Sequence, residues 1–178
     1  IRKVHSGKEA SYEGEFYEIE DVQLDFEVPR EKVPIYMAAM GPKMMQLTGE
    51  IAEGVLLSVG TPAEWMDVAY ENLEKGADRA NRSIDDIDVA SYILTSIDED
   101  GEKAREVMGS FLAHELSLGI FDHILSDIGM AEELEPMRKE ARNGNLEKAE
   151  EYINDEIIDT FSVAGTPEEC KEKMKKFV

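Results

Sequence analysis

Short apolar runs alternate with segments of helical periodicity through the middle of the chain. Residues 33–38 read Val-Pro-Ile-Tyr-Met-Ala, a continuous apolar run that predicts a strand buried on both faces, as in parallel sheets. Similar runs at residues 55–59 and 89–97 predict two more strands. Apolar residues at helical spacing follow each run: Met44, Leu47 and Ile51; then Met66, Ala69, Leu73, Ala77 and Ala80; then Ala104, Val107, Phe111 and His114 or Glu115. Residues 33–118 are therefore predicted to form three strand–helix units.

Residues 1–32 precede these units and have a different pattern. Aromatic and β-branched residues flank Glu13-Gly14, which predicts a small hairpin over residues 11–19. Apolar and polar residues then alternate over residues 22–28, as they do in a half-buried strand or an extended arm. We therefore expect a hairpin and a connecting arm ahead of the first buried strand.

The part of the chain that follows the three units is mainly helical in pattern. Residues 119–160 carry only helical signals, with a clear break at Asn143-Gly144-Asn145. Residues 161–178 predict a loop and then the start of a final helix, because Thr166 opens a capping-box pattern. We expect one partial α/β domain over residues 1–178. The order of elements fits a doubly wound open sheet or a slice of a (β/α)8 barrel, and periodicity alone does not choose between them.

The balance of charges excludes whole classes of partner. The chain has 178 residues, of which 40 are acidic and 19 are basic, so its formal net charge is −21. Nucleic acids and anionic membrane surfaces both attract cationic protein surfaces, so neither is an expected partner. Hydrophobic residues make up 42% of the chain, which is enough for a packed core, yet no stretch is long and apolar enough to span a membrane.

Single residues limit the location and chemistry further. Cys170 is the only cysteine, so no internal disulfide can form and we expect a cytoplasmic protein. We interpret the isolated His5, His114 and His123 as surface or packing residues, and we expect no metal site. The sequence has no dinucleotide-binding glycine fingerprint and no P-loop. It begins without methionine and stops within a helical pattern, so we expect it to be a piece of a longer protein.

The strongest signal for a binding site lies between the first strand and its helix, in Ala38-Ala39-Met40-Gly41-Pro42-Lys43-Met44. Small residues there let a ligand approach the backbone closely. The N–H groups at the start of a helix and the helix dipole favour an anion such as phosphate, and Lys43 adds positive charge. A tight turn that needs small residues for packing explains the same pattern, and spacing alone favours this simpler explanation.

Ser58-Val59-Gly60-Thr61 takes the equivalent place after the second strand. Its hydroxyl groups are candidates for binding a phosphate or a cofactor. For Thr61 a role as helix N-cap is the better explanation, because Pro62 suits the first helical position and Glu64 completes a capping box. Ser58 has no such explanation. Weaker candidates lie on the third strand, at Tyr92, Thr95 and Ser96.

Two stretches carry a resemblance to a known family. Residues 33–44 read Val-Pro-Ile-Tyr-Met-Ala-Ala-Met-Gly-Pro-Lys-Met, and residues 49–57 read Gly-Glu-Ile-Ala-Glu-Gly-Val-Leu-Leu. Together they resemble the central signature of the luciferase-like family. Within that family they are most similar to the methylenetetrahydromethanopterin reductases, which use the deazaflavin coenzyme F420. Further matching stretches are residues 87–92, 96–100 and 161–168, and the helical part at about 117–154 is not covered.

The resemblance implies a fold and a set of binding residues. The fold is a (β/α)8 barrel, luciferase-like, of which this chain covers about the C-terminal half; its three predicted strands would be the fifth, sixth and seventh. In this family the Ala-Ala-x-Gly-Pro turn helps hold the phosphate-bearing tail of the cofactor. The reductases usually have Gly-Ala-Gln before Gly-Pro, whereas Met40 stands here in place of Gln, which leaves the exact substrate open. The implied cofactor-binding residues are Ala38, Ala39, Met40, Gly41, Pro42, Lys43, Met44, Ser58 and Val59.

The activity implied by the resemblance is hydride transfer between coenzyme F420 and a one-carbon pterin. The partner would be this small-molecule substrate, and the full-length protein would be a homo-oligomer. Two alternatives stay open: an FMN-dependent monooxygenase of the same family, and a non-catalytic partial barrel that only binds a partner. In the family the residues near the reacting ring come largely from earlier strands, so no catalytic residue is assigned. We expect the isolated piece to be inactive.

Overall fold

The computed structural model describes residues 1–30 and 32–177, and it divides the chain into two compact units. The first unit covers Ile1–Ile35 and the second covers Tyr36–Val178. The single domain expected from the sequence stays a prediction.

The first unit consists of a short helix and the expected hairpin. Helix α1 (Arg2–His5) precedes strand β1 (Ala10–Glu13), which pairs antiparallel with β2 (Glu18–Val22). The Gly14 N–H closes the turn by donating to the Tyr17 carbonyl oxygen at 3.0 Å. Strand β2 ends at Val22 and no strand follows it among the described residues of this unit, so residues 23–28 do not form a half-buried strand.

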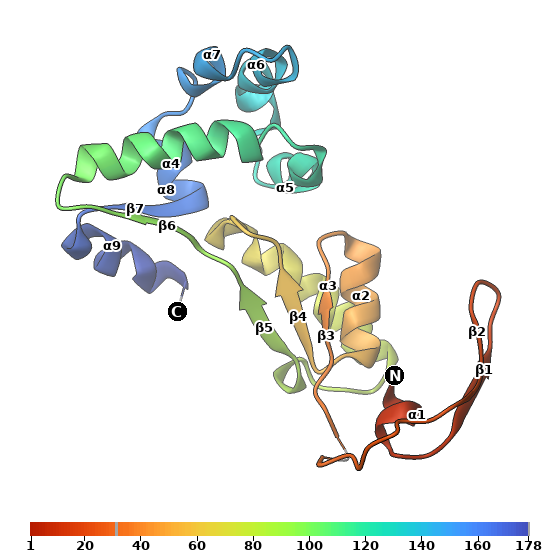
Figure 1. The fold of residues 1–178 in the computed structure, drawn as a ribbon. Coiled ribbons are helices and arrows are strands. Elements are labelled where there is room, and N and C mark those ends of the chain that lie inside the picture. The colour runs from red at the N-terminus through yellow and green to blue at the C-terminus, as the bar shows by residue number, and fades with distance from the viewer. Residues whose placement is uncertain (31, 178) are drawn as a thin grey trace. The chain divides into compact units, whose positions relative to one another are not determined.

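The second unit begins with a parallel sheet in the order β3-β4-β5. In register, Met37 lies opposite Val55, and Val55 lies opposite Val89. Two helices pack against each other on one face of this sheet, as Figure 1 shows. The strands are β3 (Tyr36–Ala38), β4 (Gly54–Leu57) and β5 (Asp88–Ser91), and the helices are α2 (Pro42–Ile51), α3 (Met66–Arg79) and the 3-10 turns η1 (Ala63–Trp65) and η2 (Ile84–Asp86).

The expected burial holds for β4 but is wrong for β3. Val55 and Leu57 on the central strand are fully buried. On β3 the side chains of Tyr36 and Ala38 are exposed, because β3 is an edge strand of the described sheet. The strand is also shorter than predicted, and Pro34 has no N–H to donate to a ladder.

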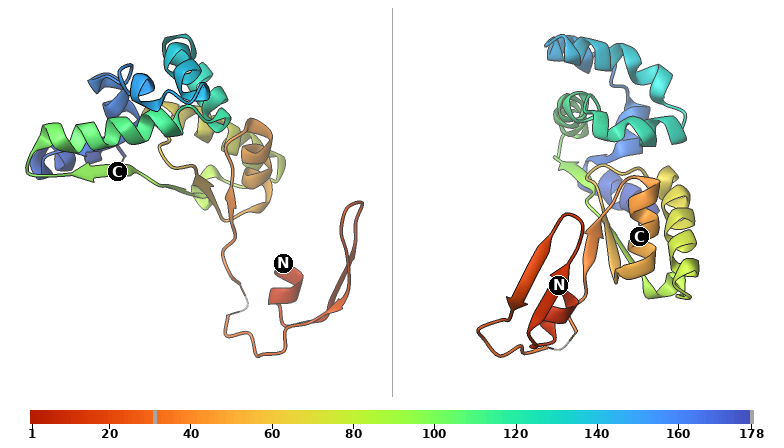
Figure 2. Two further views of the ribbon diagram at one scale, coloured as in Figure 1. Left: turned by 45° about the horizontal axis from the view of Figure 1, so that its top comes forward. Right: turned by 90° about the vertical axis from the view of Figure 1, so that its right-hand side faces the viewer.

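The single strand predicted at residues 89–97 is two strands in different sheets. The chain leaves β5, passes Tyr92 and Ile93, and continues as β6 (Leu94–Ile97), which runs along helix α4 (Gly101–Glu115; Figure 2). Strand β6 pairs in parallel with β7 (Ser162–Gly165), with Leu94 opposite Ser162. The loop predicted at the start of residues 161–178 is therefore wrong at β7. All of β7 is buried, because α4, α8 (Asp155–Phe161) and α9 (Pro167–Met174) pack around it.

The helical excursion at residues 119–160 is confirmed. The break at Asn143-Gly144-Asn145 separates two of its helices, and a second break before Asp155 divides what the sequence presents as one helical stripe. Figure 1 shows two of these helices, α6 (Ala131–Arg142) and α7 (Leu146–Glu150), on the far side of α4 from β6. The elements are η3 (Gly119–Phe121), α5 (Asp122–Asp127), α6 (Ala131–Arg142), α7 (Leu146–Glu150) and α8 (Asp155–Phe161), followed after β7 by α9 (Pro167–Met174) and η4 (Lys175–Phe177).

Two of the three helices bury a different face from the one expected. On α2 the predicted positions are exposed, and Met45, Thr48 and Gly49 are buried instead. The reason is the close approach of α2 to α3: a Cβ on Gly49 would lie 2.1 Å from the Leu73 carbonyl oxygen. The exposed predicted positions are Met44, Leu47 and Ile51 on α2 and Val107 and Phe111 on α4. On α3 the predicted face is buried except for Ala80 and part of Met66.

Among the residues that the structure describes, no helix is both long enough and apolar enough to cross a membrane.

Candidate functional site

A cavity of about 480 Å³ lies where the three parallel strands of the first sheet end. The register aligns Ala38, Leu56 and Ala90 across the sheet, so the carboxyl ends of these strands meet at one edge. This is the edge at which parallel α/β folds bind their ligands. The cavity is lined by Ala38, Ala39 and Met40 after β3, by Leu56, Leu57, Ser58 and Val59 along β4, and by Tyr92 after β5.

The structure brings together most, but not all, of the residues expected from the sequence. Ala38, Ala39, Met40, Ser58 and Val59 line the strand-end cavity. Of the remaining expected residues, Pro42 lines a smaller neighbouring cavity, and Gly41, Lys43 and Met44 line neither. The sequence ranked Tyr92 as a weaker candidate, yet it lines the cavity, whereas Thr95 and Ser96 do not.

The turn after β3 has the backbone of a helix start. Gly41 is the N-cap of α2, and Pro42 occupies the first helical position as predicted. Gly41 has an ordinary negative φ of −86°, and a Cβ built on it would meet nothing within 4 Å. The fold itself therefore does not require glycine at this position, and the space beside it is open. The first N–H groups of a helix have no intrahelical partner, so they are available to a ligand there.

Met40 connects the strand ends to one another. Its sulfur accepts the N–H of Ser58 at 3.1 Å, and its carbonyl oxygen lies 2.8 Å from Nε2 of His123. The turn after β4 is linked to the end of β5, because the Gly60 N–H donates to the Tyr92 carbonyl oxygen at 3.2 Å. The ends of β3, β4 and β5 are therefore linked by hydrogen bonds.

The smaller cavity, of about 210 Å³, lies on the other side of Met40. His123 and Trp65 meet there edge to face, with ring centroids 5.7 Å apart. The Trp65 indole N–H donates to the Asp127 carboxylate at 2.9 Å. His123 is a packing residue, as interpreted from the sequence, and it also contacts the Met40 carbonyl oxygen. Nothing in the sequence indicates this contact, because His123 is 83 residues from Met40 and belongs to the helical stretch outside the resemblance. The lining residues are Met40, Pro42, Met45, Trp65, Val68, Asn72, His123 and Asp127.

The helix start predicted at Thr61 is not formed as expected. The Thr61 hydroxyl donates to the Ser58 carbonyl oxygen at 2.8 Å, so it caps no helix N–H. Pro62 is the N-cap of a 3-10 turn, without a side-chain cap. Thr61 is buried and braces the turn that carries Ser58.

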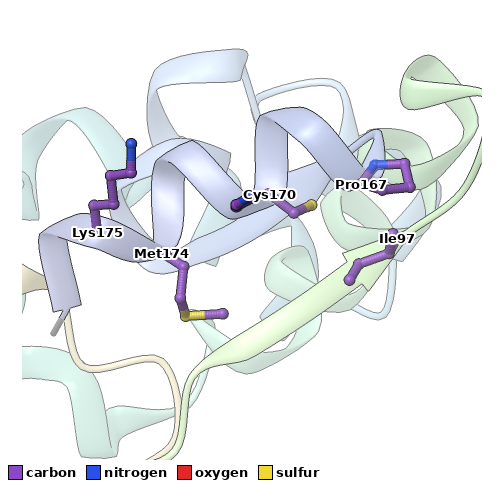
Figure 3. Close-up of a pocket in the computed structure, with 6 residues that line it drawn as sticks. Ile97, Pro167, Cys170, Met174 and Lys175 are labelled. Atoms are coloured by element: carbon purple, nitrogen blue, oxygen red, sulfur yellow. The ribbon is translucent and has the colours of Figure 1, made fainter.

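A third cavity, of about 530 Å³, lies along α9. Figure 3 shows Cys170 and Met174 projecting from α9 on the side of β6, where Ile97 lies. Cys170 is 3% exposed, and its thiol contacts the Gly165 carbonyl oxygen at 3.5 Å. Burial raises the pKa of Cys170, so the thiol keeps its proton at neutral pH. Its place in the first turn of a helix therefore does not make it a nucleophile.

The parallel strand–helix units and the strand-end cavity define an α/β protein whose candidate ligand site lies at the carboxyl ends of the strands. A family model described as luciferase-like monooxygenase matches residues 1–178, and the chain belongs to this family. The resemblance stated from the sequence is thereby confirmed.

Relatives in the family are named reductases. The chain is 33% identical to the 5,10-methylenetetrahydromethanopterin reductase of Archaeoglobus fulgidus, over 99% of this chain and 53% of the relative. It is 30% identical to the same-named enzyme of Methanolobus tindarius, over 100% of this chain and 54% of the relative. The chain spans about half the length of these relatives.

A solved structure settles the choice of fold. The coenzyme F420-dependent tetrahydromethanopterin reductase from Methanopyrus kandleri superposes with a TM-score of 0.81 at 32% identity, covering 99% of this chain and 51% of that one. The chain is therefore part of a (β/α)8 barrel, and the doubly wound open sheet is set aside. An F420-dependent secondary alcohol dehydrogenase, at 21% identity and a TM-score of 0.71, shares the fold.

Proposed function

We propose that the protein is an oxidoreductase that transfers a hydride between coenzyme F420 and a one-carbon pterin. The observation that carries this proposal is the open turn at Gly41, the N-cap of α2, which directly follows Met40 in the wall of the strand-end cavity. Relatives that match nearly the whole chain at 30–33% identity are named methylenetetrahydromethanopterin reductase, which gives the reaction class.

The residues present fit a cofactor with a flat ring and an anionic tail. The walls of the cavity are mainly apolar, which suits a ring system, and Tyr92 adds an aromatic side chain. The start of α2 suits the anionic tail through its N–H groups and dipole, and the exposed Lys43 adds a positive charge. When bound, F420 would supply the hydride chemistry, and this half of the barrel would bind and orient it.

Each part of the turn has its own task under this proposal. Ala38 and Ala39 are small, so the cofactor can come close to the backbone at the end of β3. Ser58 presents a hydroxyl at the end of β4, while its N–H is occupied by the sulfur of Met40. The apolar residues of β4 exclude water from the wall of the cavity.

FMN is the alternative cofactor, because its phosphate would suit the same turn. The solved reductase from Methanopyrus kandleri is coenzyme F420-dependent, which favours the deazaflavin. A non-catalytic binding module stays the second alternative. We also propose a cytoplasmic, homo-oligomeric full-length protein, with its single buried cysteine in keeping with a reducing compartment.

The proposal is tested by titrating the full-length protein with F420 and, separately, with FMN. We expect F420 to bind, and Gly41→Val to weaken binding by about tenfold or more, because the new side chain fills the open space at the turn. Gly119→Val is the matched control, because its Cβ would make only an ordinary contact, 3.7 Å from the Asp122 carboxylate. Preference for FMN would move the protein to the monooxygenase branch, and binding of neither cofactor would overturn the proposal.

A further inference from the structure

The turn after β3 is held from outside the first sheet by one side chain of the helical excursion. Nε2 of His123, on α5, lies 2.8 Å from the Met40 carbonyl oxygen. We propose that His123 is a positioning residue for the cofactor turn, which fixes the peptide between Met40 and Gly41. This inference rests on the proposed function, because it assigns His123 to the binding of the same cofactor.

The contact fixes which nitrogen of the ring carries a hydrogen. A carbonyl oxygen only accepts hydrogen bonds, so Nε2 of His123 must donate. The neutral tautomer protonated at Nε2 and the imidazolium form both have this hydrogen. The hydrogen bond from His123 to Met40 is therefore possible whether or not the imidazole ring is charged, and it stabilises the turn in both forms.

The ring of His123 is itself held in place. Trp65 is 2% exposed and meets the ring edge to face, and its indole N–H donates to Asp127 on the same helix as His123. Asp122, the residue before His123, forms an ion pair with the nearly buried Arg138 of α6. The histidine donor is thus fixed from both sides, as a positioning role requires.

Fixing the Met40 carbonyl also fixes the direction of the next N–H. The carbonyl of Met40 and the N–H of Gly41 belong to one peptide plane, and the described residues contain no cis peptide bond. In a trans peptide these two groups point to opposite sides. Because the carbonyl points to His123, at the smaller cavity, the Gly41 N–H points away from that cavity. His123 therefore orients the first donor of the turn for an anionic ligand.

The experiment compares variants of the full-length protein that lose or keep the side-chain donor at position 123. His123→Phe keeps an aromatic ring against Trp65 but has no donor, whereas His123→Gln keeps a side-chain N–H. His114→Phe, at an exposed histidine of α4, is the matched control. We expect His123→Phe to weaken F420 binding by about tenfold, the effect of losing one hydrogen bond. His123→Gln should restore binding to within about threefold of wild type, and His114→Phe should leave it unchanged.

A second readout does not depend on the cofactor. Amide hydrogen exchange of the ligand-free protein at Gly41, Lys43 and Met44 should be faster in His123→Phe and normal in His123→Gln. The reason is that His123→Phe loses the hydrogen bond to the Met40 carbonyl oxygen and His123→Gln keeps it. A purely structural role of the ring predicts the opposite order, because phenylalanine keeps a ring against Trp65 and glutamine does not. If His123→Phe does not fold, His123→Asn replaces it, because its shorter side chain does not reach Met40.

The outcomes separate this inference from the proposed function. Normal F420 binding in His123→Phe, with binding still weakened by Gly41→Val, would overturn the role of His123 and leave the proposed function standing. Failure of the wild-type protein to bind F420 would overturn the proposed function, and amide exchange would then decide about His123. Exchange rates that are the same in all variants would overturn the positioning role in either case.

Discussion

The Tyr36 hydroxyl donates a hydrogen bond to the carboxylate of Asp88, across the full width of the β3-β4-β5 sheet. Gly54 lies on the strand between them, and a Cβ there would be 2.4 Å from the tyrosine ring. All three residues begin their strands. The ring can cross the central strand only because Gly54 has no side chain, and the contact closes the end of the sheet opposite the cavity.

The contact between Tyr36 and Asp88 predicts alkaline sensitivity. The hydrogen bond to Asp88, with smaller effects of burial and of the Asp88 charge, raises the pKa of Tyr36. A raised pKa stabilises the fold below the ordinary tyrosine value of about 10, and this contribution is lost as the pH rises through the folded-state pKa. Urea denaturation from about pH 8 to about pH 11 should show a steeper loss of stability in wild type than in Tyr36→Phe. Tyr70→Phe should keep the wild-type slope, and equal slopes in all three would contradict the prediction.

Gly76 is the point where α3 approaches α2 most closely. A Cβ on Gly76 would lie 1.8 Å from the backbone oxygen of Gln46, so Gly76→Ala must push the two helices apart. We expect it to destabilise the protein by about 3 kcal/mol or more. Gly109→Ala, inside α4, is the control: its Cβ would make ordinary contacts at 3.8 Å with Ile153 and Ile158. That variant should be more stable by about 0.5–1 kcal/mol. Urea denaturation measures both, and changes of the same sign would contradict the prediction.

The sequence alone indicates the order of the elements but not which face of each helix is buried. The apolar run at β4 and the positions of Gly41 and Pro42 follow from local chemistry, and the structure agrees with them. The buried face of α2 is set by the contact between Gly49 and α3. A hydrophobic pattern does not reveal this contact, because glycine has no side chain. The division of residues 89–97 between two sheets likewise depends on β7, which lies far along the chain.

The candidate site divides in the same way between local and distant residues. Ala38, Met40 and Ser58 could be predicted because strand ends in parallel folds carry binding residues, and these positions can be read directly from the chain. His123 and Trp65 could not be predicted, because their role depends on how the helical excursion folds back on the turn after β3. No periodicity encodes such a long-range contact.

Thr166 and Thr61 stand in similar Gly-Thr-Pro sequences but differ in what they bind. The Thr166 hydroxyl accepts the Glu169 N–H, and the Glu169 carboxylate accepts the Thr166 N–H at 2.8 Å, which completes the capping box of α9. Thr166→Ala should therefore destabilise the protein by about 1 kcal/mol, and Thr166→Ser should keep most of the stability. Thermal or urea denaturation measures both variants. A serine variant as unstable as the alanine variant would show that the cap contributes nothing.

Asp159 accepts hydrogen bonds from Arg105 at 2.8 Å and from Lys173 at 2.5 Å, and so joins α4, α8 and α9. Burial opposes its charge, but these hydrogen bonds and the two positive charges outweigh burial and lower the pKa of Asp159. A lowered pKa stabilises the fold above the ordinary value of about 3.9, and the contribution is lost as the pH falls through the folded-state pKa.

The carboxylate of Asp159 is partly exposed, so Asp159→Asn should lower the free energy of unfolding by about 1 kcal/mol or less at neutral pH. Urea midpoints from about pH 6 to about pH 2 should fall less steeply in Asp159→Asn than in wild type, whereas Glu71→Gln, in an exposed pair with Lys75, should keep the wild-type slope. An unchanged acid slope in Asp159→Asn would refute this linkage.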